Sequence, residues 1–185
     1  MPASETVSYL QQNNLLLATA ESCTAGRIVA LLAEVPGSGS LVDCGYVVYS
    51  PEAKHRLLGV KPETIERFNL TSVEVAQEMA EGALQDSPAN VAIATTGLCG
   101  TEDVDGIPAG TVCFAWGFVH AGRTCVFTEI QRFSGDRETM QHEAALHALE
   151  RLPYVHLKLK GLEIQLMNTR PSATRDSLRR SQSTG

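Results

Sequence analysis

The alternation of apolar and polar positions predicts a chain built from short buried strands and amphipathic helices. A continuous apolar run at 15–20 and a second segment at 91–96 have the length and composition of strands that are buried on both faces, and a further strand is predicted at 41–48. Helices are predicted by apolar residues at helical spacing at 4–12, 24–33, 71–85 and 136–152, with a further helix opening at Pro51. Strands at 110–120 and 124–133 are expected to form a hairpin. This order of elements favours an α/β fold, a three-layer α/β/α sandwich on a mixed, mostly parallel sheet.

The pattern changes after Pro153. Alternating apolar residues in the next segment are compatible with one more strand: Val155, Leu157 and Leu159. The end of the chain is rich in Ser, Thr and Arg, a composition that cannot bury a core. We therefore expect one domain over 1–165 and a disordered polar tail over 166–185.

Composition and charge narrow the range of partners. The chain has 185 residues, of which 43% are hydrophobic, enough for one full core. The chain has 15 Lys and Arg and 21 Asp and Glu, so its formal net charge is −6. This balance lacks the basic footprint of a nucleic-acid binder, so no nucleic-acid partner is expected.

Compartment is indicated by hydropathy and by cysteine usage. No apolar run approaches the roughly 20 residues that span a bilayer, and residues 1–14 lack the pattern of a signal peptide. The five cysteines are scattered and form no C-x-x-C pair, which is typical of reduced thiols. We expect a cytoplasmic protein without a membrane partner, and homo-oligomerisation stays open.

The segment from Glu21 to Gly26 lies where a buried strand is expected to give way to a helix. Ligands of open α/β sheets bind at the carboxyl ends of strands, and a helix N-terminus offers N–H groups to an anion or a developing oxyanion. A plainer interpretation is that Ser22 or Thr24 is only a helix N-cap, which the local pattern alone favours.

A second strand-to-helix junction carries Tyr49 at its strand end and Lys54 in the first helical turn. A lysine at a helix N-terminus is disfavoured by the helix dipole, and such local conflicts are typical of functional sites. The same dipole favours the neutral amine that a general base needs. Taken alone, Lys54 is also compatible with an ordinary solvated surface residue.

Together these segments resemble the CinA C-terminal domain family, whose active members are nicotinamide-nucleotide amidases. The resemblance spans 15–152 and is carried by several motifs in the family's order, at 20–26, 45–54, 58–60, 97–100, 110–112 and 133–137. It implies that Ser22 is a nucleophile activated by Tyr49 and Lys54. It also implies a small-molecule nucleotide substrate, nicotinamide mononucleotide, which is hydrolysed to nicotinate mononucleotide and ammonia without a metal or other cofactor. The substrate-binding residues that it implies are Glu21, Cys23, Thr24, Gly26, Gly97, Gly100, Thr111 and Arg137.

Two departures from the family pattern bear on this expectation. Ala25 stands where the family usually has a second glycine, and the loop 101–107 carries Glu102, Asp103 and Asp105 where the family tends to have glycines and a lysine. Carboxylates beside a substrate phosphate are repulsive. The alternative function is a catalytically silent paralogue that binds a nucleotide or a protein partner in competence or DNA uptake.

A rival nucleophile is adjacent to Ser22. A thiol at a helix N-terminus has a depressed pKa, and Cys23 is predicted to occupy such a position.

Overall fold

A single mixed sheet of five strands organises the chain. The structure, a computed structural model, describes residues 2–169. The strands are β1 Leu17–Glu21, β2 Val42–Val47, β3 Val91–Gly97, β4 Thr111–His120 and β5 Arg123–Arg132. Their order across the sheet is β2-β1-β3-β4-β5; β2, β1 and β3 run parallel, and β4 and β5 form the antiparallel hairpin expected from the sequence.

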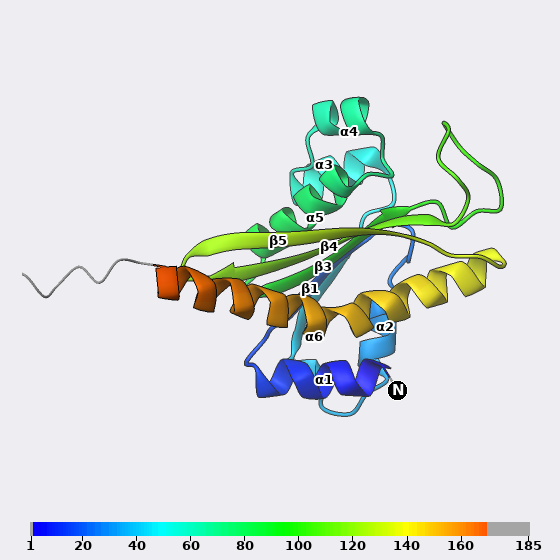
Figure 1. The fold of residues 1–185 in the computed structure, drawn as a ribbon. Helices are drawn as coiled ribbons and strands as arrows, with labels where there is room; N and C mark the ends of the chain where they lie inside the picture. Colours follow the sequence, from blue (N-terminus) through cyan, green and yellow to red (C-terminus); the bar gives the residue numbers. More distant parts are fainter. Residues whose placement is uncertain (1, 170–185) are drawn as a thin grey trace, which may run out of the picture.

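Helices cover both faces of this sheet (Figure 1). One face carries α1 Pro2–Gln12, α2 Arg27–Ala33 and α6 Arg137–Thr169, and the opposite side carries α3 Pro51–Leu58, α4 Pro62–Phe68 and α5 Val73–Asp86. A short 3-10 turn, Ser38–Ser40, precedes β2. Each face has its own apolar cluster: one includes Phe114 and Trp116 of β4 together with residues of α6, and the other includes Met79 of α5. The predicted α/β/α sandwich is confirmed.

Helix α6 corrects one expectation about the C-terminal part of the chain. The residues after Pro153 continue this helix to Thr169, so the predicted extra strand is wrong. A proline inside a helix leaves the carbonyl four residues earlier without its usual donor. That carbonyl belongs to Leu149, and the Thr6 hydroxyl of α1 donates to it at 3.2 Å. Tertiary packing therefore allows a helix that the local pattern does not indicate.

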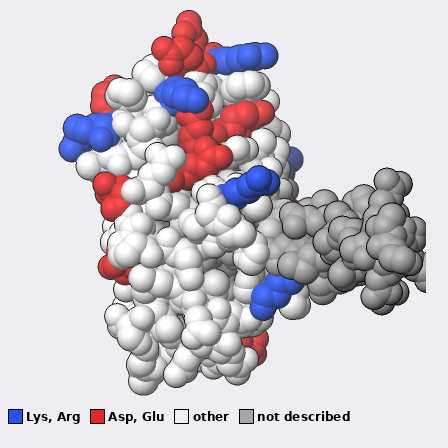
Figure 2. Space-filling model, turned by 90° about the vertical axis from the view of Figure 1, so that its left-hand side faces the viewer, with Lys and Arg blue, Asp and Glu red and all other residues white. Residues whose placement is uncertain are grey.

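The boundary expected at residue 165 falls within α6, and residues 170–185 of the predicted tail lie outside the described residues. No helix in the described part of the chain combines the length and the apolar character that a membrane crossing requires. Figure 2 shows one side of the molecule, on which Lys and Arg are interspersed with Asp and Glu at the level of α3–α5, whereas the part below is largely uncharged.

Candidate active site

The carboxyl ends of the three parallel strands meet at a cavity of about 360 Å³. Glu21, the last residue of β1, pairs with Val47 of β2 on one side and with Thr95 of β3 on the other. Ser22 follows directly and contributes to the cavity wall together with Tyr49, which follows β2. This is the edge at which ligands bind in open α/β sheets.

Lys54 reaches Ser22 from the first turn of α3. This helix begins with Pro51, and its N-cap Ser50 accepts a hydrogen bond from the Ala53 N–H. Lys54 is 1% exposed, which rules out the solvated-surface interpretation. Its Nζ donates to Ser22 Oγ at 2.9 Å and to the backbone carbonyl oxygens of Val48 at 2.9 Å and Tyr49 at 3.2 Å. Burial lowers the pKa of the Lys54 ammonium, because a low-dielectric environment penalises the charged form.

Tyr49 lines the cavity, and its hydroxyl faces a different partner. The side chain is 58% exposed, and its hydroxyl oxygen accepts a hydrogen bond from the Arg137 guanidinium at 2.5 Å. Arg137 is the first residue of α6 and also lines the cavity. The structure therefore forms the direct Lys54–Ser22 contact, and Tyr49 meets Lys54 through its backbone carbonyl.

Glu21 lies behind the cavity wall, where it is fully buried. Its carboxylate accepts hydrogen bonds from the Thr24 hydroxyl at 2.7 Å and from the N–H groups of Gly26, Ile28 and Val29 at 3.0, 3.1 and 3.1 Å. The start of α2 is thus occupied by the protein's own carboxylate, and the expectation that it is open to a substrate anion is wrong. Glu21, Thr24 and Gly26 instead hold the turn that carries Ser22.

The predicted helix at 24–33 begins later than expected. Ala25 has a φ of 53° and Gly26 a φ of 90°, so both residues are left-handed and α2 starts at Arg27. Glycine adopts this conformation freely, whereas in alanine the Cβ atom comes too close to the following carbonyl oxygen. The substitution of the family's second glycine therefore falls at a position that requires a positive φ.

Cys23 and Cys99 are buried neighbours in the wall of the same cavity. A hydrogen bond with Cys99, together with burial, raises the pKa of the Cys23 thiol well above its ordinary value, and the same bond lowers that of Cys99. The depressed pKa expected for Cys23 is therefore wrong, since Cys23 precedes the first turn of α2 and lies beside a second thiol. Gln141 of α6 donates to the Cys23 carbonyl at 2.9 Å and holds this turn in place.

The remaining predicted residues shape the loop that follows β3. Gly97 and Gly100 line the cavity, and a Cβ on Gly97 would lie 2.4 Å from the Thr111 carbonyl oxygen, so only glycine fits there. Thr111 lies outside the cavity lining and donates from its hydroxyl to the Pro108 carbonyl at 2.7 Å, which braces the loop. Glu102 and Asp105 of the loop do line the cavity.

Sequence reasoning missed one side of the cavity, the connection between α4 and α5. Residues 69–71 line it, and the buried Thr96 hydroxyl at the end of β3 donates to the Leu70 carbonyl at 2.8 Å. Thr96 could have been found by the strand-end rule that identified Ser22. The 69–71 backbone carries no such signal, because its place depends on how α5 packs.

The fold and this cavity define an α/β/α domain with a serine–lysine pair at the carboxyl ends of its parallel strands. Comparison with known proteins identifies the family. The family model of the CinA C-terminal domain matches residues 2–155, and the chain belongs to this family.

The chain is similar both to proteins of about its own length and to much longer proteins. The nicotinamide-nucleotide amidohydrolase PncC of Enterobacter agglomerans is 42% identical over 133 residues, which cover 71% of this chain and 79% of that protein. A competence-damage inducible protein of Acetivibrio thermocellus is 39% identical over 155 residues, which cover 82% of this chain and 36% of that longer protein. The chain thus spans about a third of the longer relatives.

A solved structure agrees with this assignment. The crystal structure of a competence-damaged protein (CinA) superfamily protein from Escherichia coli is 36% identical to this chain, with a TM-score of 0.77. The match covers 83% of this chain and 88% of that one.

Proposed function

We propose that the chain is an amidohydrolase that cleaves the carboxamide of nicotinamide mononucleotide to nicotinate mononucleotide and ammonia. The observation that carries the proposal is the 2.9 Å contact between the buried Lys54 Nζ and Ser22 Oγ at a cavity. The substrate is supported by the similarity to a nicotinamide-nucleotide amidohydrolase.

Lys54 is arranged to act as a base toward Ser22. Its other two partners are the backbone carbonyls of Val48 and Tyr49, which can only accept hydrogen bonds. When the ammonium loses one proton, these carbonyls keep the two remaining N–H groups, and the nitrogen lone pair faces the Ser22 hydroxyl. The lowered pKa of Lys54 makes this neutral form accessible.

The reaction then proceeds in two halves. Lys54 takes the Ser22 proton as Oγ bonds to the carboxamide carbon, and the carbonyl electron pair moves to the oxygen. The tetrahedral intermediate collapses by breaking the C–N bond, and the Lys54 ammonium delivers its proton to the nitrogen, which leaves as ammonia. Water attacks the resulting ester and gives a proton to Lys54, and the acid departs as Ser22 regains its proton.

Ammonia release from nicotinamide mononucleotide by the purified protein tests this function. We expect turnover by the wild type and by Ser8→Ala, a control on α1 whose hydroxyl donates to the Ser4 carbonyl one turn earlier, and no turnover by Ser22→Ala. A wild type that binds the nucleotide without releasing ammonia would instead support the catalytically silent paralogue.

A further inference from the structure

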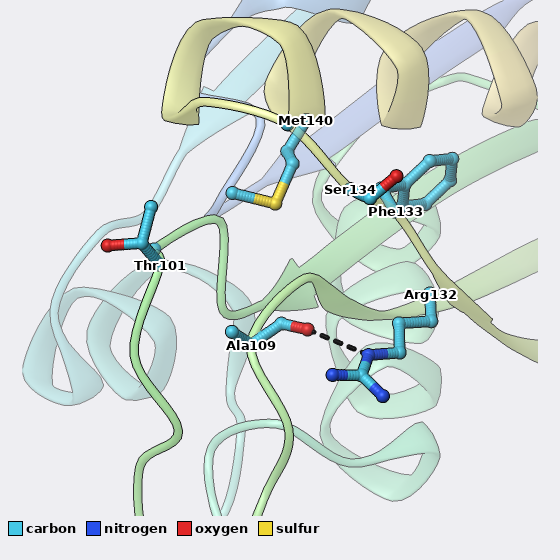
Figure 3. Close-up of a pocket in the computed structure, with 8 residues that line it drawn as sticks. Thr101, Ala109, Arg132, Phe133, Ser134 and Met140 are labelled. Atoms are coloured by element: carbon cyan, nitrogen blue, oxygen red, sulfur yellow. Dashed lines mark hydrogen bonds between the residues drawn. The ribbon is translucent and has the colours of Figure 1, made fainter.

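A second cavity, of about 380 Å³, lies on the other side of the loop that follows β3. Figure 3 shows it between this loop, with Thr101 and Ala109, and the end of β5, with Arg132, Phe133 and Ser134. The two cavities share Gly100 in their walls and therefore adjoin each other. Its volume falls within the range of small-molecule sites, about 300–1,000 Å³.

The two cavities differ in charge. Arg132 is the charged residue among those that line the second cavity. The Ser22 cavity carries the carboxylates Glu102 and Asp105 alongside Lys54 and Arg137, and deprotonation of Lys54 leaves its lining net negative. An anionic group is therefore favoured in the second cavity, and a cationic pyridinium ring is favoured in the Ser22 cavity.

Arg132 is fixed in place by the backbone of the loop. Its Nε donates to the Ala109 carbonyl at 3.0 Å, a contact drawn in Figure 3. Strands β4 and β5 are in close contact here, because the Phe133 N–H donates to the Gly110 carbonyl at 2.9 Å and a Cβ on Gly110 would lie 1.9 Å from the Phe133 oxygen. The two terminal guanidinium nitrogens carry four further N–H donors. In the described part of the chain no carboxylate forms an ion pair with Arg132.

We propose that the second cavity is a phosphate-binding subsite in which Arg132 holds the phosphate of a nucleotide whose carboxamide reacts at Ser22. The guanidinium supplies paired donors that match phosphate geometry. Thr101 and Ser134 line the same cavity. A nucleotide placed across Gly100 holds its phosphate farther from Glu102 and Asp105 than one held entirely in the Ser22 cavity, so their repulsion is weaker but still acts at low salt. This inference rests on the proposed function for the identity of the nucleotide.

Arg132→Gln, compared with the wild type on nicotinamide mononucleotide and on nicotinamide riboside, tests the subsite. The two substrates differ only in the phosphate. At low salt we expect Arg132→Gln to raise the KM of the mononucleotide roughly tenfold or more, with kcat and the riboside KM unchanged. Arg132→Lys should restore part of the affinity, and Arg123→Gln, at the opposite end of β5, is the matched control.

Equal KM changes for the two substrates, or none for the mononucleotide, would overturn the subsite while leaving the amidase function standing. Calorimetric binding of nicotinamide mononucleotide separates the two proposals if the wild type releases no ammonia. Selective loss of that binding in Arg132→Gln would then support the subsite without the amidase, and equal or absent binding by both proteins would overturn it.

Discussion

Lys54 combines two features that rarely coincide: its side chain is fully buried, and it can carry a positive charge. Burial of an unpaired ammonium is costly, and proteins meet that cost by hydrogen bonds or by a shift toward the neutral form. Here both occur: three oxygen atoms surround Nζ, and desolvation lowers the pKa. An apolar side chain at this position would avoid the desolvation cost, so the buried lysine supports the proposed role as a base.

The pH dependence of the rate follows from this lowered pKa. The base is the neutral amine, so kcat/KM should rise with pH as Lys54 deprotonates and level off below the usual lysine value of about 10.4. Lys54→Arg should be inactive, because a guanidinium stays protonated. Lys61→Arg, at a lysine whose side chain is 71% exposed, is the control. A flat profile or an active Lys54→Arg would show that Lys54 only binds charge.

The two candidate nucleophiles at the β1–α2 turn can be separated by substitution. The raised pKa keeps the Cys23 thiol protonated near neutral pH, and the thiolate is the reactive form. We therefore expect Cys23→Ala to retain kcat within a few-fold and Ser22→Ala to lose it, as measured by ammonia release. Loss of turnover in Cys23→Ala, with turnover retained in Ser22→Ala, would identify Cys23 as the nucleophile.

At this scale, the sequence allows only residues with a local signal to be predicted. Ser22 and Lys54 have such a signal, since one follows a buried strand and the other conflicts with a helix dipole. The local pattern alone favours an N-cap for Ser22, however, and only the family resemblance implies catalytic roles for both. The role of Glu21 was not foreseeable, because its partners lie in a backbone turn whose shape depends on two left-handed residues.

Among the elements, the connection from β1 to α2 contains a strained position. Ala25 is exposed and left-handed, a conformation that costs an L-residue about 1–2 kcal/mol. The strain persists because Glu21 anchors the backbone on the helix side of this position through Gly26, Ile28 and Val29.

Ala25→Gly should therefore stabilise the domain. Relief of the left-handed penalty outweighs the greater freedom of glycine in the unfolded chain, about 0.4–1 kcal/mol, so a net gain of about 0.5–1 kcal/mol is expected. The measurement is urea unfolding. Ala30→Gly, at an exposed right-handed position inside α2, is the matched control and should lose about 1 kcal/mol. Destabilisation by both substitutions would show that Ala25 is unstrained.

Element types were predictable wherever the apolar pattern is unbroken, as in β1, whose five residues are all buried, or in α5, whose apolar residues recur at helical spacing. Element ends were less so. The N-terminus of α2 and the passage of α6 through Pro153 both depend on contacts with distant residues, such as the bond from Thr6 to Leu149. Local propensity is a weak guide where tertiary packing supplies the missing hydrogen bond.

In the whole molecule, the loop at 101–107 contributes residues to the cavity at the carboxyl ends of the three parallel strands. The three acids of this loop have different roles. Asp103 accepts a hydrogen bond from the Ala109 N–H at 2.8 Å and holds the loop closed, whereas Glu102 and Asp105 line the Ser22 cavity. The sequence alone shows three equivalent carboxylates, because only the folded loop decides which of them face the substrate.

The double substitution Glu102→Gln and Asp105→Asn tests whether these cavity-lining acids influence substrate choice. Asparagine suits the left-handed φ of 51° at Asp105, so the backbone should be preserved. Both nicotinamide mononucleotide and the riboside carry the pyridinium cation. The KM of the mononucleotide divided by the KM of the riboside therefore isolates the effect on the phosphate. We expect this ratio to fall a few-fold at low salt and to return toward the wild-type value at about 0.5 M salt, since screening shortens the reach of exposed charges to a few ångströms. Asp103→Asn, which removes a charge of the same loop outside the cavity lining, is the control and should change the ratio less. An unchanged ratio at low salt would mean that the two acids point their charge into solvent and do not discriminate between substrates.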